Sequence, residues 1–221
     1  MTDYKTSSDK LNGRAALVAV SKFHPYEAVL EAYEQGARLF GENRVQEMRE
    51  KFPPKDERPD GMKVFLIGQL QRNKVRKAIE WCDRIESVDS LPLIDKIEKE
   101  AAELGITMDV LLEFNSSGEE QKSGFRSEEE LLEGAGYILS SCSHIRMKGV
   151  MTVGPLGGDD VKNRAAFSKT KALYDRVREI AATVDTLSMG MSADWETALE
   201  YGSTEVRIGT AIFGERDYSR K

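Results

Sequence analysis

The sequence contains few residues of the types that bind metals or form disulfide bonds. Its 221 residues include two cysteines, Cys82 and Cys142, and two histidines, His24 and His144. The cysteines have neither a CxxC nor a longer metal-binding spacing, and a disulfide scaffold needs a denser set. We therefore expect no metal site and a reducing, cytoplasmic location. Any chemistry must come from other side chains or from a bound cofactor.

The chain also lacks an excess of positive charge and a long hydrophobic run. It has 32 Lys and Arg against 38 Asp and Glu, a net charge of −6, so the basic surface of a nucleic-acid-binding protein is missing. No apolar segment approaches the ~20 residues of a membrane-spanning helix, and the start, MTDYKTSSDK, has no apolar core of a secretion signal. With 40% hydrophobic and 32% charged residues, the composition is that of a soluble globular protein that binds neither nucleic acid nor a membrane.

Short apolar runs alternate with longer amphipathic segments along the whole chain. Most runs are apolar on both faces, as are the strands of a parallel sheet that is covered by helices. The expected strands are residues 15–20, 38–41, 64–68, 84–88, 108–114, 147–153, 186–191 and 205–213. Helices are predicted at residues 25–35, 90–104, 161–183 and 193–201. This α/β alternation predicts a single (β/α)8 barrel, and an open doubly wound sheet is the competing fold.

In such a barrel the functional residues lie where each strand ends and the next loop begins. Polar residues occupy all of these positions: Ser21 and Lys22, Glu42 and Asn43, Gln69 to Gln71, Asp89, Asn115, Thr152, Ser192, and Gly209 with Thr210. Lys22 directly follows the run LVAV and Ser21, where apolar walls can desolvate its amine and make it available for a Schiff base. A solvated loop lysine is the alternative interpretation.

The segment 188–214, SMGMSADWETALEYGSTEVRIGTAIFG, is the most informative part of the sequence. Ser192 is well placed as the N-cap of the next helix, and Gly209 and Thr210 follow the last predicted strand. The loops after the seventh and eighth strands commonly bind phosphate in these barrels, so we expect a phosphorylated ligand. Ordinary capping and a simple turn are the alternative.

Two further polar residues are candidates for ligand binding. Arg207 lies inside the apolar run VRIG, where an unpaired guanidinium would be costly, so it needs Glu205, Asp194 or a ligand as its acceptor. Asn43 could orient a ligand through its amide, and it is an equally good cap for the helix that NRVQEMRE predicts.

Six ordered blocks of the sequence resemble the pyridoxal phosphate homeostasis protein family, and together they span nearly the whole chain. They are LVAVSK at 17–22, FGENRVQE at 40–47, IGQLQRNK at 67–74, NSSGEEQKSGF at 115–125, GVMTVG at 149–154 and the segment 188–214. The resemblance implies a single (β/α)8 barrel like the N-terminal domain of alanine racemase, fold type III among pyridoxal 5′-phosphate (PLP) proteins. It also implies that PLP binds at the barrel mouth.

The resemblance assigns particular residues to PLP binding. They are Lys22 as the Schiff-base lysine, Ser192, Gly209 and Thr210 as the phosphate site, Arg207 as the partner of the pyridine nitrogen, and Asn43 and Met189 along the ring. An arginine does not easily give up its proton, so the pyridine nitrogen stays unprotonated and the ring is a weak electron sink.

The sequence departs from the family pattern at two places. The family usually has Trp-His-Phe-Ile-Gly at the third strand, whereas this chain has VFLIG at 64–68, so Phe65 replaces a histidine next to the ring. Any polar contact of that histidine would be lost. About fourteen residues precede Ala15, fewer than is common in the family, so one end of the barrel is expected to be less covered.

We expect a PLP-binding protein of intracellular vitamin B6 homeostasis without robust catalysis. Racemisation needs an acid or base on each face of the substrate, and the chain has no room for the second domain that completes such a site in racemases. The alternatives are a PLP-dependent amino-acid racemase of low activity and a PLP-free barrel that acts on a phosphorylated metabolite. We expect residues 1–221 to form one PLP-binding domain with 1–14 as a short extension. The expected state is a cytoplasmic monomer with PLP and apo PLP-dependent enzymes as partners.

Overall fold

Eight parallel strands form a closed barrel in which neighbours in sequence are neighbours in space and β8 pairs with β1. The computed structural model describes residues 3–155, 157 and 159–215. The strands are β1 (Ala16–Val20), β2 (Leu39–Glu42), β3 (Lys63–Leu66), β4 (Arg84–Val88), β5 (Met108–Glu113), β6 (Ile145–Met151), β7 (Thr186–Ser188) and β8 (Glu205–Ile208). The predicted (β/α)8 barrel is confirmed, and the pairing of β1 with β8 excludes the open doubly wound sheet.

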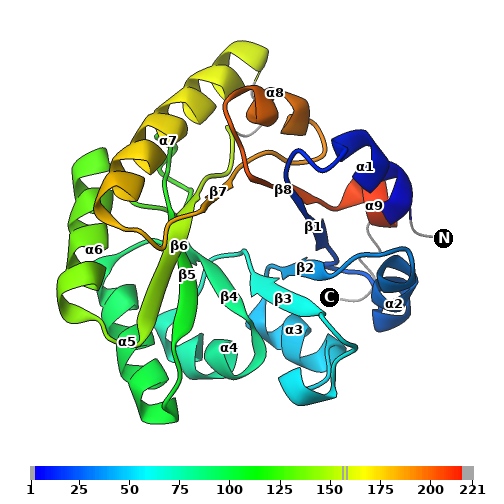
Figure 1. Ribbon diagram of the computed structural model, residues 1–221, viewed down its shortest axis with the longest axis horizontal. Helices are drawn as coiled ribbons and strands as arrows, with labels where there is room; N and C mark the ends of the chain where they lie inside the picture. The colour runs from blue at the N-terminus through cyan, green and yellow to red at the C-terminus, as the bar shows by residue number, and fades with distance from the viewer. Residues whose placement is uncertain (1–2, 156, 158, 216–221) are drawn as a thin grey trace.

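Helices surround the barrel as an outer ring (Figure 1). The α-helices are α1 (Tyr4–Leu11), α2 (Tyr26–Glu34), α3 (Val45–Lys51), α4 (Val75–Trp81), α5 (Leu91–Leu104), α6 (Glu128–Ser141), α7 (Asp160–Ile180), α8 (Trp195–Glu200) and α9 (Thr210–Phe213), with 3-10 turns η1 (Lys55–Glu57) and η2 (Arg72–Lys74). In the part of the chain that the structure describes, no helix is both long and apolar enough to cross a membrane.

The residue pattern explains why each β/α unit consists of a buried strand and a helix that covers it. Helix α5 buries Leu93, Ile94, Ile97 and Ala101, whose spacing places them on the helix face that packs on the barrel. Helix α6 begins where the Ser127 side chain accepts a hydrogen bond from the Glu130 amide, and Asp159 caps α7 in the same way. The apolar runs therefore form the barrel wall, and the amphipathic segments cover it.

Two strands end three or more residues earlier than predicted. The last strand ends at Ile208 and not at 213, because the Gly209 carbonyl accepts the amides of Ile212 and Phe213 and starts the short helix α9. Strand β7 ends at Ser188 and not at 191. Gly190 has φ +100°, a conformation that ends the extended strand.

Helix α1 lies within the predicted extension 1–14 and sits beside α9 (Figure 1). The Asp3 amide donates to the Ile212 carbonyl over 2.8 Å. Tyr4 and Leu11 are buried and belong to the hydrophobic core. Helix α1 thus joins the start of the described chain to the last strand–helix unit.

Candidate functional site

A pocket of about 320 Å³ opens where the strands end at their carboxyl termini. This volume falls in the lower part of the range of roughly 300–1,000 Å³ that holds small molecules. Six of the seven residues expected to bind PLP line it: Lys22, Asn43, Ser192, Arg207, Gly209 and Thr210. These six residues lie at the ends of four strands, β1, β2, β7 and β8, and meet at one place although they are spread over nearly 190 positions of sequence.

The seventh expected residue, Met189, lies elsewhere. It is fully buried and belongs to the hydrophobic core. Met191, two residues further along, lines the pocket instead. Met191 takes this place because β7 ends early. The chain turns at Gly190, and Met191 after the turn lies at the barrel mouth.

The backbone before Lys22 is held firmly by its neighbours. The Ser21 hydroxyl donates to Glu42 over 2.7 Å, and the Ser21 carbonyl accepts from the Lys51 amine over 2.7 Å. Ser21 and Glu42 are fully buried, whereas Lys22 is half-buried and reaches the pocket. The backbone that carries Lys22 is therefore already ordered before a ligand binds.

Glu42 and Glu47 share the Lys51 ammonium group below this loop. Lys51 donates to Glu42 over 2.7 Å and to Glu47 over 2.9 Å. Burial raises the pKa of Glu42 to about 7 against the opposing charge of Lys51, and the charge of Glu47 adds to the increase. Glu47 also accepts the amide of Phe23, which has φ +66°. This contact holds the loop in its tight turn directly after Lys22.

Asn43 reaches the pocket from the end of β2. The residue that occupies the N-cap position of α3 is Arg44, so Asn43 does not cap this helix. Its side-chain oxygen Oδ1 is buried and has no hydrogen-bond partner in the described chain. Gly68 lies against its backbone so closely that a Cβ there would come within 2.4 Å of the Asn43 carbonyl oxygen. The missing side chain at 68 therefore allows Asn43 its position, and its amide is ready for a ligand.

Ser192 is not the helix cap that the sequence suggested. Helix α8 begins at Trp195 with Asp194 at the N-cap position, and the Asp194 carboxylate accepts the Met191 amide over 2.6 Å. Because the turn is closed by Asp194, the Ser192 hydroxyl is left on the exposed pocket wall.

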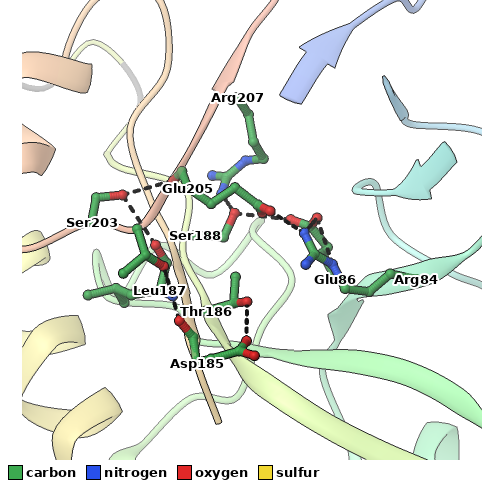
Figure 2. Close-up of polar contacts among 10 residues, drawn as sticks. Arg84, Glu86, Asp185, Thr186, Leu187, Ser188, Ser203, Glu205 and Arg207 are labelled. Carbon is green, nitrogen blue, oxygen red and sulfur yellow. Dashed lines mark hydrogen bonds and ion pairs between the residues drawn. The ribbon is translucent and has the colours of Figure 1, made fainter. Parts of the chain in front are cut away.

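Arg207 is 4% exposed, and its acceptors are neutral oxygens and not the expected carboxylates. Its Nη1 donates to the Ser188 hydroxyl over 2.5 Å, and its Nη2 donates to the Thr152 carbonyl over 2.6 Å. Glu205 pairs with Arg84, and Asp194 accepts the Met191 amide. Figure 2 shows Arg207 above this group of charges. Ordinary strand alternation explains why Arg207 and Glu205, two residues apart, both point into the barrel.

The barrel interior below the pocket contains charged side chains. Arg84 donates to Glu86 over 2.5 Å and pairs with Glu205, and its guanidinium lies 3.9 Å from the centre of the Phe65 ring (Figure 2 shows the polar contacts). Burial would lower the pKa of Arg84, but the charges of Glu86 and Glu205 raise it above its ordinary value. Phe65, at the position where the family usually has histidine, thus packs on a cation.

Several of these residues were not expected from the sequence. His24 lines the pocket and stacks on Phe213, with ring centres 5.2 Å apart. Glu86 and Arg84 were seen only as part of an apolar run. The sequence does contain a signal for Arg84 and Glu86. Two charged residues at alternate positions of a buried strand point to the same face, so they need charged or polar partners there.

A closed (β/α)8 barrel with a lysine after β1 and an arginine on β8 at one mouth is a barrel of the alanine racemase N-terminal type. The profile of the family described as alanine racemase, N-terminal domain, matches residues 3–217. The chain belongs to the pyridoxal phosphate homeostasis protein family. It is 41% identical to the family protein of Mus musculus over 216 residues, 93% of this chain and 78% of that one. It is 38% identical to that of Haemophilus influenzae over 206 residues, 92% of this chain and 86% of that one.

Solved structures agree with this assignment. PipY of Synechococcus elongatus PCC7942, solved with PLP bound, is 34% identical and superposes with a TM-score of 0.82, covering 96% of this chain and 100% of PipY. Alanine racemase of Clostridium difficile 630 is 17% identical with a TM-score of 0.73, covering 94% of this chain and 55% of the racemase, a likeness of fold alone. The family that the six sequence blocks indicated is confirmed.

Proposed function

We propose that this protein binds PLP at the barrel mouth and serves intracellular PLP homeostasis as a cofactor-holding protein. The observation that carries the proposal is the meeting of Lys22, Asn43, Ser192, Arg207, Gly209 and Thr210 in one pocket. The relatives named pyridoxal phosphate homeostasis protein and the PLP-bound PipY support it. The proposal treats residues 1–221 as one PLP-binding domain.

The residues present fit PLP. The pocket offers an amine for the aldehyde, a buried guanidinium beside its wall, an amide oxygen without a partner, and hydroxyls at the ends of β7 and β8. Lys22 would hold the aldehyde carbon as a Schiff base, with loss of water. Ser192, Gly209 and Thr210 would bind the phosphate. When bound, PLP can act as an electron sink for amino-acid chemistry.

Arg207 accounts for a holding function in place of rapid turnover. An arginine side chain does not easily give up its proton, so an N–H of Arg207 would donate to the pyridine nitrogen of bound PLP and would leave that nitrogen unprotonated. A ring with an unprotonated nitrogen stabilises a carbanion poorly. The two hydrogen bonds to Ser188 and Thr152 keep this N–H donor at the pocket wall.

The test is covalent trapping on Lys22. We expect purified protein to take up PLP with a visible absorption band, and borohydride to fix the cofactor on the peptide that contains Lys22. Lys22→Ala should lose the band, whereas Lys169→Ala, an exposed lysine on α7, should keep it. Protein that takes up no PLP, or that is labelled at another lysine alone, would contradict the proposal.

A PLP-dependent racemase of low activity is the competing function, and one observation bears on it. Racemisation needs a proton donor or acceptor on both faces of the α-carbon. Among the described residues that line the pocket, the titratable groups besides Lys22 are His24 and Arg207. We expect no rapid loss of α-deuterium from amino acids. Rapid loss that Lys22→Ala abolishes would instead establish the racemase.

We further propose that the protein is a cytoplasmic monomer that passes PLP to apo PLP-dependent enzymes. The exposed large apolar side chains of the described chain are Leu139 on α6, Val161 and Ile180 at the two ends of the 21-residue helix α7, and Met191 in the loop after β7. Scattered residues of this kind do not make a dimer interface. Light scattering should give the monomer mass. Reactivation of an apo-enzyme by the loaded protein should be faster than release of PLP into buffer.

A further inference from the structure

Two strands on opposite sides of the barrel carry charged residues toward each other. In a closed eight-stranded barrel, β4 and β8 are four strands apart in either direction. Arg84 and Glu86 alternate along β4, and Glu205 and Arg207 alternate along β8, so each pair faces the interior. Arg207 is nearest the mouth, because β8 runs from Glu205 toward the pocket.

Hydrogen bonds connect these four side chains through one hydroxyl. Arg207 Nη1 donates to Ser188 Oγ over 2.5 Å, and Ser188 Oγ donates to Glu86 Oε2 over 3.0 Å. Glu86 Oε1 accepts from Arg84 over 2.5 Å, and Arg84 also pairs with Glu205. The Ser188 hydroxyl has a single hydrogen. It can accept from Arg207 only on a lone pair while that hydrogen points at Glu86 (Figure 2).

We propose that Glu86 is a positioning residue, which holds the Arg207 guanidinium at the pocket wall through the Ser188 hydroxyl. The carboxylate fixes the direction of the hydroxyl hydrogen and thereby presents an oxygen lone pair to Arg207. The consequence for PLP rests on the proposed function, whereas the effect on Arg207 is a property of the protein alone.

Arg84 and Phe65 keep Glu86 in its place. Glu86 is fully buried, and an uncompensated carboxylate there would be costly. Arg84 supplies the opposite charge to Glu86 and Glu205, and it is itself stacked on the Phe65 ring 3.9 Å away. Counting formal charges, the two arginines balance the two glutamates, so this group of residues needs no external ion.

The geometry predicts what a loose Arg207 would do. An arginine side chain has many rotamers, and with the Thr152 carbonyl alone it would keep one acceptor below the pocket. The N–H donor for the pyridine nitrogen would then be present for only part of the time. PLP binding would have to order the side chain again and would become weaker.

The experiment compares Ser188→Ala with Ser203→Ala as its matched control. Ser203 is also a buried serine between β7 and β8, and among the described residues its hydroxyl has only backbone carbonyls as hydrogen-bond acceptors, those of Leu187, Met189 and Glu205. In apoprotein labelled with ¹⁵N-arginine, we expect the Arg207 guanidinium resonances to be sharp in the wild type and in Ser203→Ala. They should be broadened in Ser188→Ala.

The second measurement is PLP binding. Loss of a hydrogen bond to a charged group should raise the Kd of Ser188→Ala for PLP about tenfold or more, and Ser203→Ala should stay within about twofold of the wild type. PLP labelled with ¹⁵N at the pyridine nitrogen should shift in Ser188→Ala and not in Ser203→Ala. Glu86→Gln, which keeps an acceptor oxygen without the charge, should give an intermediate effect and covers the case of a Ser188 variant that fails to fold.

Each outcome decides one question. Sharp Arg207 resonances and an unchanged Kd in Ser188→Ala would overturn the positioning role. Equal effects of Ser188→Ala and Ser203→Ala would show a structural role only and would overturn it as well. If wild-type protein binds no PLP, the proposed function fails, and the apoprotein resonances still decide whether Glu86 and Ser188 position Arg207.

Discussion

Glu113 offers a direct test of the electrostatics of the barrel, because its carboxyl is buried at the end of β5. The Ser123 hydroxyl donates to Oε1 over 2.9 Å, and Oε2 is buried with no hydrogen-bond partner in the described residues. Burial raises the pKa of Glu113 to about 7 despite the hydrogen bond from Ser123, and the charge of Asp89 adds to the increase. The folded protein therefore holds this proton more tightly than the unfolded chain does.

The sign and size of the effect follow from this rise. The stability that the proton contributes is complete below the unfolded pKa of 4.5 and is lost as the pH rises through about 7. At roughly 1.36 kcal/mol per pKa unit, the loss amounts to about 3 kcal/mol by pH 8. Glu113→Gln keeps an acceptor for Ser123 and cannot ionise. We therefore expect its free energy of unfolding to exceed that of the wild type increasingly from pH 5 to pH 8.

The assay is urea unfolding at four values of pH, with tryptophan fluorescence as the signal that reports unfolding. The difference between Glu113→Gln and wild type should grow by about 3 kcal/mol across the range, whereas Glu120→Gln, an exposed residue of the following loop, should show a constant difference. A difference for Glu113→Gln that does not change with pH would refute the reasoning, because the carboxyl would then ionise as easily in the fold as in water.

Three further outcomes can be measured. Gly190→Ala should destabilise the fold by about 1–3 kcal/mol in urea unfolding, since Gly190 has φ +100° and a Cβ would lie 2.7 Å from a methyl carbon of α8; an unchanged midpoint would contradict the strain. Phe65→Leu should cost about 1–2 kcal/mol in the same assay, because it removes the ring below the Arg84 guanidinium; equal stability would show that the contact contributes nothing. Burial raises the pKa of Cys82 to about 12 and that of Cys142 to about 11, so a thiol reagent at pH 8 should modify Cys142 slowly and Cys82 only after unfolding; fast labelling of Cys82 in native protein would contradict its burial.

The fold could be predicted because the hydrophobic pattern changes period along the chain. Apolar strand runs alternate with amphipathic segments along the chain, and every predicted strand overlaps an observed one, whereas helix bounds were predicted at four places and α6 was not foreseen. The errors within the sheet lie at strand ends. Residues 209–213 are apolar enough to continue strand β8, but the hydrogen bonds of a single turn make them the helix α9.

The sequence predicted where the site residues lie, but only some of their hydrogen-bond partners. Residues that follow strands must meet at the barrel mouth, which places Lys22, Asn43 and Thr210 together whatever the loop details. The partner of Arg207 depends on which side chains of other strands reach the interior, and this in turn depends on barrel closure. Sequence reasoning correctly required a partner for Arg207, but the two carboxylates that it named, Glu205 and Asp194, bond to other groups.

The charged interior is explained better by the position of Arg207 than by stability. Replacing a buried ion pair by apolar residues of similar volume is often neutral or stabilising, so the contacts among Arg84, Glu86 and Glu205 are weak grounds for a stabilising role. What apolar residues could not supply is an oriented hydroxyl under a buried guanidinium. The exchange of histidine for Phe65 belongs to the same arrangement, since an aromatic face gives the Arg84 guanidinium a surface to stack on without adding another titratable group. An apolar ring at the third strand therefore supports the charged network and does not weaken it.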